Sequence, residues 1–247
     1  MNTATRLRYY IESLCIYDLK NDEVISSLLD LLKNTKNENV LSKQSIFFNN
    51  VSAHDSLKSY ISKLILTDDN VFTKTSACGK TDRLSDFVIS GVKSDLMKLE
   101  AIANVKPEDI FHDVSDNDIR DILSTMPKWE TGKAVKPLDK HWENQIDELS
   151  EFHKENGYGM FAKYIAFTWR NHSLFPIAGT DSIKLSDLKS YEIPRQKVVD
   201  NTESFVNGYP ANNVLLYGDS GTGKSTSIKA IVNEFYEDGL RMIEIYK

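Results

Sequence analysis

The sequence has few of the residues that would indicate a disulfide framework or a structural zinc site. Its 247 residues contain two cysteines, Cys15 and Cys78, which lie far apart and form no Cys-x-x-Cys pair. Disulfide-rich scaffolds and zinc modules need several closely spaced cysteines, so neither class is indicated. This cysteine usage predicts a reducing, cytoplasmic location. The histidines show no metal-ligand spacing either, and we interpret them as surface or packing residues: His54, His112, His141, His153 and His172.

Long hydrophobic runs and an excess of positive charge are also missing. No stretch approaches the roughly 20 apolar residues that a membrane-spanning helix needs, and the start MNTATRLRYYIE lacks the apolar centre of a signal peptide. We therefore predict no membrane segment. Lysines and arginines total 30 against 36 aspartates and glutamates, for a formal net charge of -6. That balance argues against nucleic-acid binding through bulk electrostatics, so we expect Trp129, Trp142 and Trp169 to pack in the core.

Apolar residues are abundant enough for a core, at 40% of the chain. From residue 4 to about 155 they recur every three or four positions, as on one face of a helix. Segments rich in glycine, proline and aspartate separate these stripes. We therefore predict a helical N-terminal domain over residues 1–156. Its clearest stripes lie in residues 7–14, 24–32, 57–64, 84–99, 119–126 and 142–152.

The pattern changes at Gly157. Residues 157–184 are rich in aromatic and β-branched side chains with partial alternation, which favours strands in a connecting segment. Further on, Pro194 is placed to begin a helix and Gly208 to end it.

The end of the chain has the pattern of a βαβ unit. Residues 213–218, NVLLYG, form a continuous apolar run that is typical of a strand buried on both faces of a parallel sheet. The helix that follows has an apolar stripe and ends near Gly239, and residues 240–246, LRMIEIY, form a second such strand. A right-handed crossover would make the two strands parallel members of one sheet.

The strongest motif is GDSGTGKS, residues 218–225, which fits G-x-x-x-x-G-K-S/T between a predicted strand and a predicted helix. Its glycines let backbone N–H groups surround a β-phosphate, and the helix N-terminus adds further donors. Lys224 can bridge β- and γ-phosphate oxygens, the Ser225 hydroxyl can ligand Mg²⁺, and Asp219 is expected to point to solvent. The predicted nucleotide-binding residues are Gly218, Asp219, Ser220, Gly221, Thr222, Gly223, Lys224, Ser225 and Thr226. A glycine-rich turn without a ligand is the alternative, but the motif and both flanking elements agree.

A phosphate-binding loop alone does not hydrolyse a nucleotide. Hydrolysis also needs a carboxylate at the end of another strand, a residue that positions water, and a cation. The 22 residues after Ser225 contain no apolar run that ends in Asp or Glu and leads into further structure, so we predict no catalytic residue in this chain. Two buried-type strands cannot cover their own faces and edges, and we expect a chain truncated after its first βαβ unit. Its last part is then expected to pair with another copy, dock onto the helical domain or be poorly ordered.

From about Leu185 onward the chain resembles AAA+ ATPases. LSDLKSYEIPRQKVVDNTESFVNGYPANNVLLYGDSGTGKST has their order of an entry segment, a helix, a strand and a Walker A loop. Together with FAKYIAFTW and SDLMKLEAI, it looks like the uncharacterised bacterial AAA+ family DUF815. The resemblance implies that residues 185–247 are the first part of an α/β P-loop NTPase domain, incomplete in this chain, with ATP and Mg²⁺ as cofactors. It also places Leu188 and Tyr191 near the adenine, and Ser190 stands where the family pattern has glycine.

The resemblance further implies a function for the whole protein. ATP hydrolysis would be coupled to remodelling an unknown protein partner, the helical domain would recognise or regulate, and the full-length form would be a homo-oligomer. The family's Walker B, sensor and arginine-finger positions have no counterpart in the chain, so the chain by itself is expected to be inactive. Two alternatives stay open: a non-hydrolysing scaffold that is stabilised by ATP or ADP, and a P-loop small-molecule kinase, which would need an acceptor site and a lid downstream of the loop.

Overall fold

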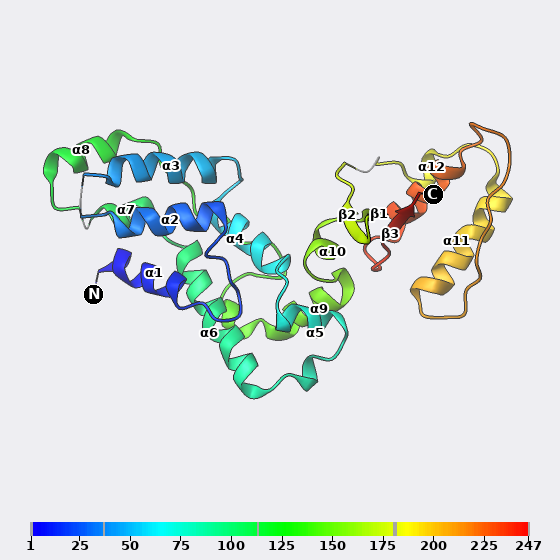
Figure 1. The fold of residues 1–247 in the computed structure, drawn as a ribbon, viewed down its shortest axis with the longest axis horizontal. Coiled ribbons are helices and arrows are strands. Elements are labelled where there is room, and N and C mark those ends of the chain that lie inside the picture. The colour runs from blue at the N-terminus through cyan, green and yellow to red at the C-terminus, as the bar shows by residue number, and fades with distance from the viewer. Residues whose placement is uncertain (1, 37, 113, 180–181, 247) are drawn as a thin grey trace. The chain divides into compact units, whose positions relative to one another are not determined.

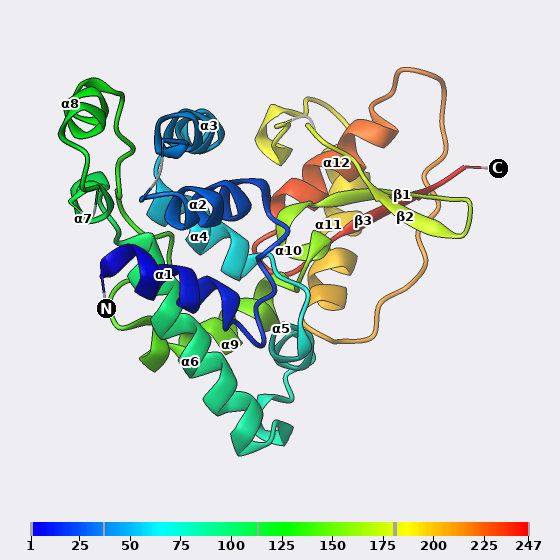
Figure 2. The ribbon, with the colours of Figure 1, turned by 60° about the vertical axis from the view of Figure 1, so that its left-hand side comes forward.

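The structure, a computed structural model, describes residues 2–36, 38–112, 114–179 and 182–246. The chain divides into two compact units, unit 1 (Met1–Phe152) and unit 2 (His153–Lys247), and the colours of Figures 1 and 2 follow the chain through both. As predicted, the N-terminal part is mostly helical, and the C-terminal part combines a short mixed sheet with helices. Residues 180 and 181 of the predicted connecting segment lie outside the described residues. No helix in the described ranges is long and apolar enough to cross a membrane.

Unit 1 is built from helices that follow the predicted stripes (Figure 1). Its helices are α1 (Thr3–Glu12), α2 (Glu23–Lys33), α3 (Val40–Ser52), α4 (Leu57–Leu66), α5 (Val71–Ala77), α6 (Asp86–Ala103), α7 (Pro107–Phe111), α8 (Asn117–Thr125) and α9 (Ile146–Asn156), the last of which continues into unit 2. Polar side chains begin several of them. Asn2, Asp22 and Asn70 accept backbone N–H groups of the first turns of α1, α2 and α5, and each such cap contributes about 1 kcal/mol.

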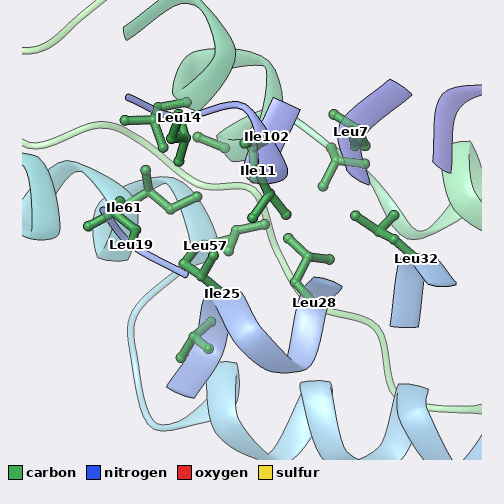
Figure 3. Close-up of a cluster of buried hydrophobic side chains, with 14 of the residues drawn as sticks. Leu7, Ile11, Leu14, Leu19, Ile25, Leu28, Leu32, Leu57, Ile61 and Ile102 are labelled. Carbon is green, nitrogen blue, oxygen red and sulfur yellow. The ribbon is translucent and has the colours of Figure 1, made fainter. Parts of the chain in front are cut away.

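The core of unit 1 gathers the apolar faces of these helices. Leu7 and Ile11 of α1, Leu28 of α2, Ile61 of α4 and Ile102 of α6 are buried in one cluster (Figure 3). Two of the tryptophans belong to the same cluster, as predicted: Trp129 and Trp142. Burial of these faces is the main source of stability for a helical domain, since isolated helices of this length are marginal in water.

Two parts of unit 1 differ from the predicted apolar stripes. Phe87, in the stripe 84–99, is 80% exposed, because the buried positions of α6 begin only at Val92. Helix α3 matches none of the predicted stripes because Gln44 occupies one of its buried positions. The Nε2 atom of Gln44 donates to the carbonyl oxygen of Pro127 at 3.1 Å, which gives the buried amide a partner.

Unit 2 contains a three-stranded sheet in its described residues. Its elements are α10 (Met160–Lys163), β1 (Ala166–Arg170), β2 (Ser173–Pro176), α11 (Glu192–Val206), α12 (Lys224–Glu234) and β3 (Met242–Ile245). The strand order is β2-β1-β3, with β1 antiparallel to β2 and parallel to β3. The strands predicted in residues 157–184 are therefore present. Trp169 on β1 is partly exposed, against the prediction that it packs in the core.

The prediction of a buried strand at residues 213–218 was wrong. This run belongs to no strand, and Leu215 and Tyr217 are 84% and 88% exposed. The second predicted strand exists as β3, but it pairs with β1. An apolar run becomes a buried strand only where a neighbouring strand binds its backbone and layers cover both faces, and no strand of the described residues pairs with residues 213–218.

Arg241 explains why β3 lies beside β1. Its Nε and Nη2 atoms donate to the carbonyl oxygens of Phe161 and Asn156, at 2.9 Å each. The next residue, Met242, donates its N–H to the carbonyl oxygen of Ile165 at 3.0 Å. These bonds attach the start of β3 to the segment that leads into β1, so the parallel register follows directly.

Helix α11 ends just before Gly208 as predicted, whereas α12 ends at Glu234, five residues before Gly239. Gly208 and Gly239 have φ values of +75° and +91°, the left-handed conformation that glycine adopts most easily. In each turn the glycine N–H and the following N–H bind carbonyl oxygens three and five residues back, as in a Schellman motif. At Gly208 these bonds satisfy carbonyl groups that the end of α11 leaves without intrahelical partners, and at Gly239 they close the turn that follows α12.

Candidate phosphate-binding site

The loop at residues 218–225 leads into α12 and has the backbone that its glycines allow. Gly218, Gly221 and Gly223 have φ values of +142°, +81° and +81°. Side chains with a Cβ atom rarely adopt such angles. Gly223 is also the residue that precedes the first turn of α12, so the loop turns directly into the helix.

The Lys224 side chain lies across this loop. Its ammonium nitrogen donates to the carbonyl oxygens of Gly218 at 2.9 Å and Asp219 at 2.7 Å. The Thr222 hydroxyl also donates to the Asp219 carbonyl oxygen, at 2.9 Å. A positive charge is therefore held against the backbone of the loop, next to its N–H groups. Asp219 itself is exposed.

The first turn of α12 adds donors and a dipole to the loop. Ser227 N–H binds the Gly223 carbonyl oxygen at 2.8 Å, as the first bond of the helix. The N–H groups of residues 224–226 precede that bond and have no carbonyl within the helix to bind. They form the positive end of the helix dipole, which attracts anions. Ser225 is exposed and Thr226 is half-buried.

A cavity of about 410 Å³ opens beside the loop, within the usual size of ligand pockets, about 300 to 1,000 Å³. Its lining residues are Tyr191, Pro194, Arg195, Val198, Leu215, Leu216, Tyr217, Gly218, Asp219, Thr222, Lys224, Ser227 and Ile231. The structure thus brings Tyr191 of the entry segment to the cavity together with the loop. Leu188 does not line it, and neither do Ser220, Gly221, Gly223, Ser225 and Thr226, which lie in the loop and the first turn of α12.

Amide side chains hold the elements around this cavity. The Asn201 side chain on α11 donates to the Asn212 carbonyl oxygen at 2.9 Å and accepts the Asn212 N–H at 2.8 Å. The Asn233 side chain on α12 donates to the Ile183 carbonyl oxygen at 3.0 Å. These bonds tie α11 to the run that leads into the loop, and α12 to Ile183, just before the entry segment.

Sequence reasoning missed the α11 wall of the cavity. Arg195 and Val198 follow Tyr191 at the fourth and seventh positions, which lie on the same face of a helix. The helix that begins near Pro194 was predicted, and its periodicity places these residues on one face. What the sequence did not show was which face of α11 turns toward the loop.

The structure offers no preformed metal cluster. In the described ranges, no group of three or more His, Cys, Asp or Glu side chains could hold a metal ion. Four of the histidines are exposed, and His153 is buried. The buried His153 ring has a hydrogen-bond partner nearby in the chain, since its Nδ1–H donates to the Gly157 carbonyl oxygen at 3.0 Å. The exposure of four histidines and the burial of the fifth agree with the interpretation of the histidines as surface or packing residues.

Comparison with known proteins connects this part of the chain to a family. Residues 162–247 match the model of the family described as "Protein of unknown function (DUF815)", as the resemblance implied. The matched segment contains the sheet, α11, the loop and α12. No curated protein matches the chain. No solved structure matches it either.

Proposed function

We propose that this protein binds the triphosphate of ATP, with Mg²⁺, in the loop at residues 218–225. The observation that carries the proposal is the Lys224 ammonium group held at 2.9 Å and 2.7 Å from two loop carbonyl oxygens, beside the N-terminus of α12. A bound phosphate would meet this charge and the first N–H groups of the helix together. Each interaction favours an anion, and they act on the same small volume.

The residues present fit both cofactors. The backbone at Gly221 and Gly223 is open, since an added Cβ would meet nothing within 4 Å, so a phosphate can approach the loop closely. Lys224 would bind phosphate oxygens, and the exposed Ser225 hydroxyl would provide a ligand to Mg²⁺. Bound Mg²⁺ supplies positive charge that offsets the charge of the phosphates. Tyr191 in the cavity wall suits a flat base, and Leu188, outside the lining, has no such place.

For the whole protein we infer ATP hydrolysis coupled to remodelling a protein partner, in a cytoplasmic homo-oligomer. The support is the match to DUF815 and the resemblance of its loop and entry segment to AAA+ ATPases. The helical unit 1 would then recognise that partner or regulate the ATPase. The formal charge of -6 gives no reason to place nucleic acid in that role.

A non-hydrolysing scaffold is the second candidate. It is favoured by the composition of the cavity, in which Asp219 is the one carboxylate among the lining residues of the described chain. Asp219 lies within the loop, whereas a Mg²⁺-holding carboxylate belongs at the end of another strand. A protein of this kind would bind ATP or ADP tightly without turning it over.

Calorimetric titration with Mg·ATP tests the proposal. Lys224→Ala removes a charged donor, and we expect the affinity to fall about 10- to 100-fold. Lys197→Ala is the matched control, because Lys197 is an exposed lysine of α11 that does not line the cavity, and its affinity should equal that of the wild type. Failure of the wild type to bind, or equal binding by Lys224→Ala, would contradict the proposal. Phosphate release measured on the full-length protein separates the candidates, since turnover there supports an ATPase and binding without turnover supports a scaffold.

A further inference from the structure

Two consecutive residues at the start of α11 adopt a conformation that side chains disfavour. Ser190 has φ +70° and Tyr191 has φ +56°, both in the left-handed region. Residues with a Cβ atom visit this region rarely, and a bulky residue such as tyrosine is an outlier there. Such a conformation persists only where the surroundings hold it.

One residue binds the carbonyl groups of both. Arg195 donates its backbone N–H to the Tyr191 carbonyl oxygen at 3.0 Å, which is an ordinary bond of the helix. Its Nη1 atom donates to the Ser190 carbonyl oxygen at 3.2 Å. The second bond comes from the side chain and fixes the peptide unit between the two left-handed residues. Helix formation alone would not supply it.

The turn at Ser190 and Tyr191, held by Arg195 and called the clamped turn below, lies at the cavity beside the loop. Tyr191 and Arg195 both line the cavity, as do Gly218 and Lys224. The loop provides the positive charge and N–H groups that suit phosphate, whereas the aromatic ring of Tyr191 provides a flat apolar surface. Bases stack on such rings, and phosphates do not.

We propose that Arg195 is a positioning residue for the nucleoside part of the bound nucleotide: its guanidinium holds Ser190 and Tyr191 in the left-handed conformation and so keeps Tyr191 in the cavity wall. This inference rests on the proposed nucleotide binding and assigns two parts of the nucleotide to two different elements. The loop binds the triphosphate, and the clamped turn binds the base and sugar. Arg195 acts through Tyr191 and leaves the phosphates to Lys224.

The test compares two ligands that share the phosphates. Competition with a fluorescent ATP analogue gives the affinities for ATP and for inorganic tripolyphosphate. Arg195→Met keeps the unbranched stem of the side chain and removes its donors, and we expect ATP binding to weaken roughly three- to tenfold, the value of one hydrogen bond. Affinity for tripolyphosphate should stay within about twofold of the wild type. Lys197→Met removes the same charge from the same helix without touching the cavity, and should change neither affinity.

A rescue variant distinguishes positioning from general damage. Glycine adopts φ +70° without strain, so Ser190→Gly in the Arg195→Met background should restore most of the ATP affinity. Unchanged ATP binding by Arg195→Met, equal weakening of ATP and tripolyphosphate, or failure of the glycine to rescue would each overturn the role of Arg195. A wild-type protein that binds neither ligand would overturn the proposed function itself, and the role of Arg195 with it.

Discussion

Replacing Gly223 with alanine isolates the part that backbone conformation plays in the loop. Gly223 has φ +81°, and a Cβ added there would meet nothing within 4 Å. The substitution therefore introduces no clash. Its cost is the strain of placing alanine in the left-handed region, about 1 to 2 kcal/mol.

The same strain sets the expected loss of affinity. If the alanine loop relaxes in the free protein, ligand binding must restore the left-handed conformation and offset that 1 to 2 kcal/mol. At about 1.4 kcal/mol for each factor of ten, this corresponds to binding of ATP that is about 5 to 30 times weaker. The estimate needs no change in the contacts of Lys224 or Ser225.

Gly208→Ala provides the matched control. Gly208 lies in the same unit with φ +75°, and an added Cβ there also meets nothing within 4 Å. Gly208→Ala should lose up to the same 1 to 2 kcal/mol of unfolding free energy in urea denaturation and keep the wild-type ATP affinity in a calorimetric titration. Gly223→Ala should lose ATP affinity, and it should lose little unfolding free energy because its loop relaxes in the free protein.

Two results would refute this reasoning. If Gly223→Ala keeps the wild-type free energy of unfolding and still binds ATP as the wild type does, the left-handed turn at Gly223 has no part in binding. If it loses affinity more than about 100-fold, the loss exceeds backbone strain. The added methyl group would then obstruct the ligand directly.

The remaining predictions concern stability. Asp95→Ala should cost unit 1 about 3 to 5 kcal/mol in urea unfolding, because the buried carboxylate accepts the N–H groups of residues 15–17 at 2.7 to 3.2 Å; a loss below about 1 kcal/mol would show that water replaces these bonds. Burial lowers the pKa of the His153 imidazole in the folded protein below its ordinary 6.5. As the pH falls, the imidazole of the unfolded chain therefore takes up a proton before that of the folded protein does. Stability should be complete above pH 6.5 and fall as the pH drops toward the folded-state pKa, by at most about 1.4 kcal/mol per pH unit, and His153→Gln should flatten this dependence.

The local features of the fold were readable because they depend on residues near one another in the chain. The stripes at residues 7–14 and 24–32 became the buried faces of α1 and α2. Gly208 ended α11 through bonds that span at most five residues. The glycines of the loop took positive φ values as the motif required. Each outcome follows from sterics or periodicity within a few residues.

The errors concern partners that are distant in the sequence. Residues 213–218 have the composition of a buried strand, yet they are exposed because no strand of the described chain pairs with them. Strand β3 pairs with β1, some 75 residues earlier, because Arg241 and Met242 bind carbonyl groups ahead of β1. Apolar composition measures how readily a strand forms, and it carries no information on which edge receives it.

The sequence by itself determined the loop, its lysine and the helix that follows, since the motif specifies both the residues and their local backbone. The tertiary structure alone decided that α11 faces this loop, and that Arg195 clamps the turn carrying Tyr191. It also decided which strand accompanies β3. The physical reason is that backbone angles and short turns depend on neighbouring residues, whereas cavity walls and strand pairs form by competition among all the surfaces that the folded chain brings together.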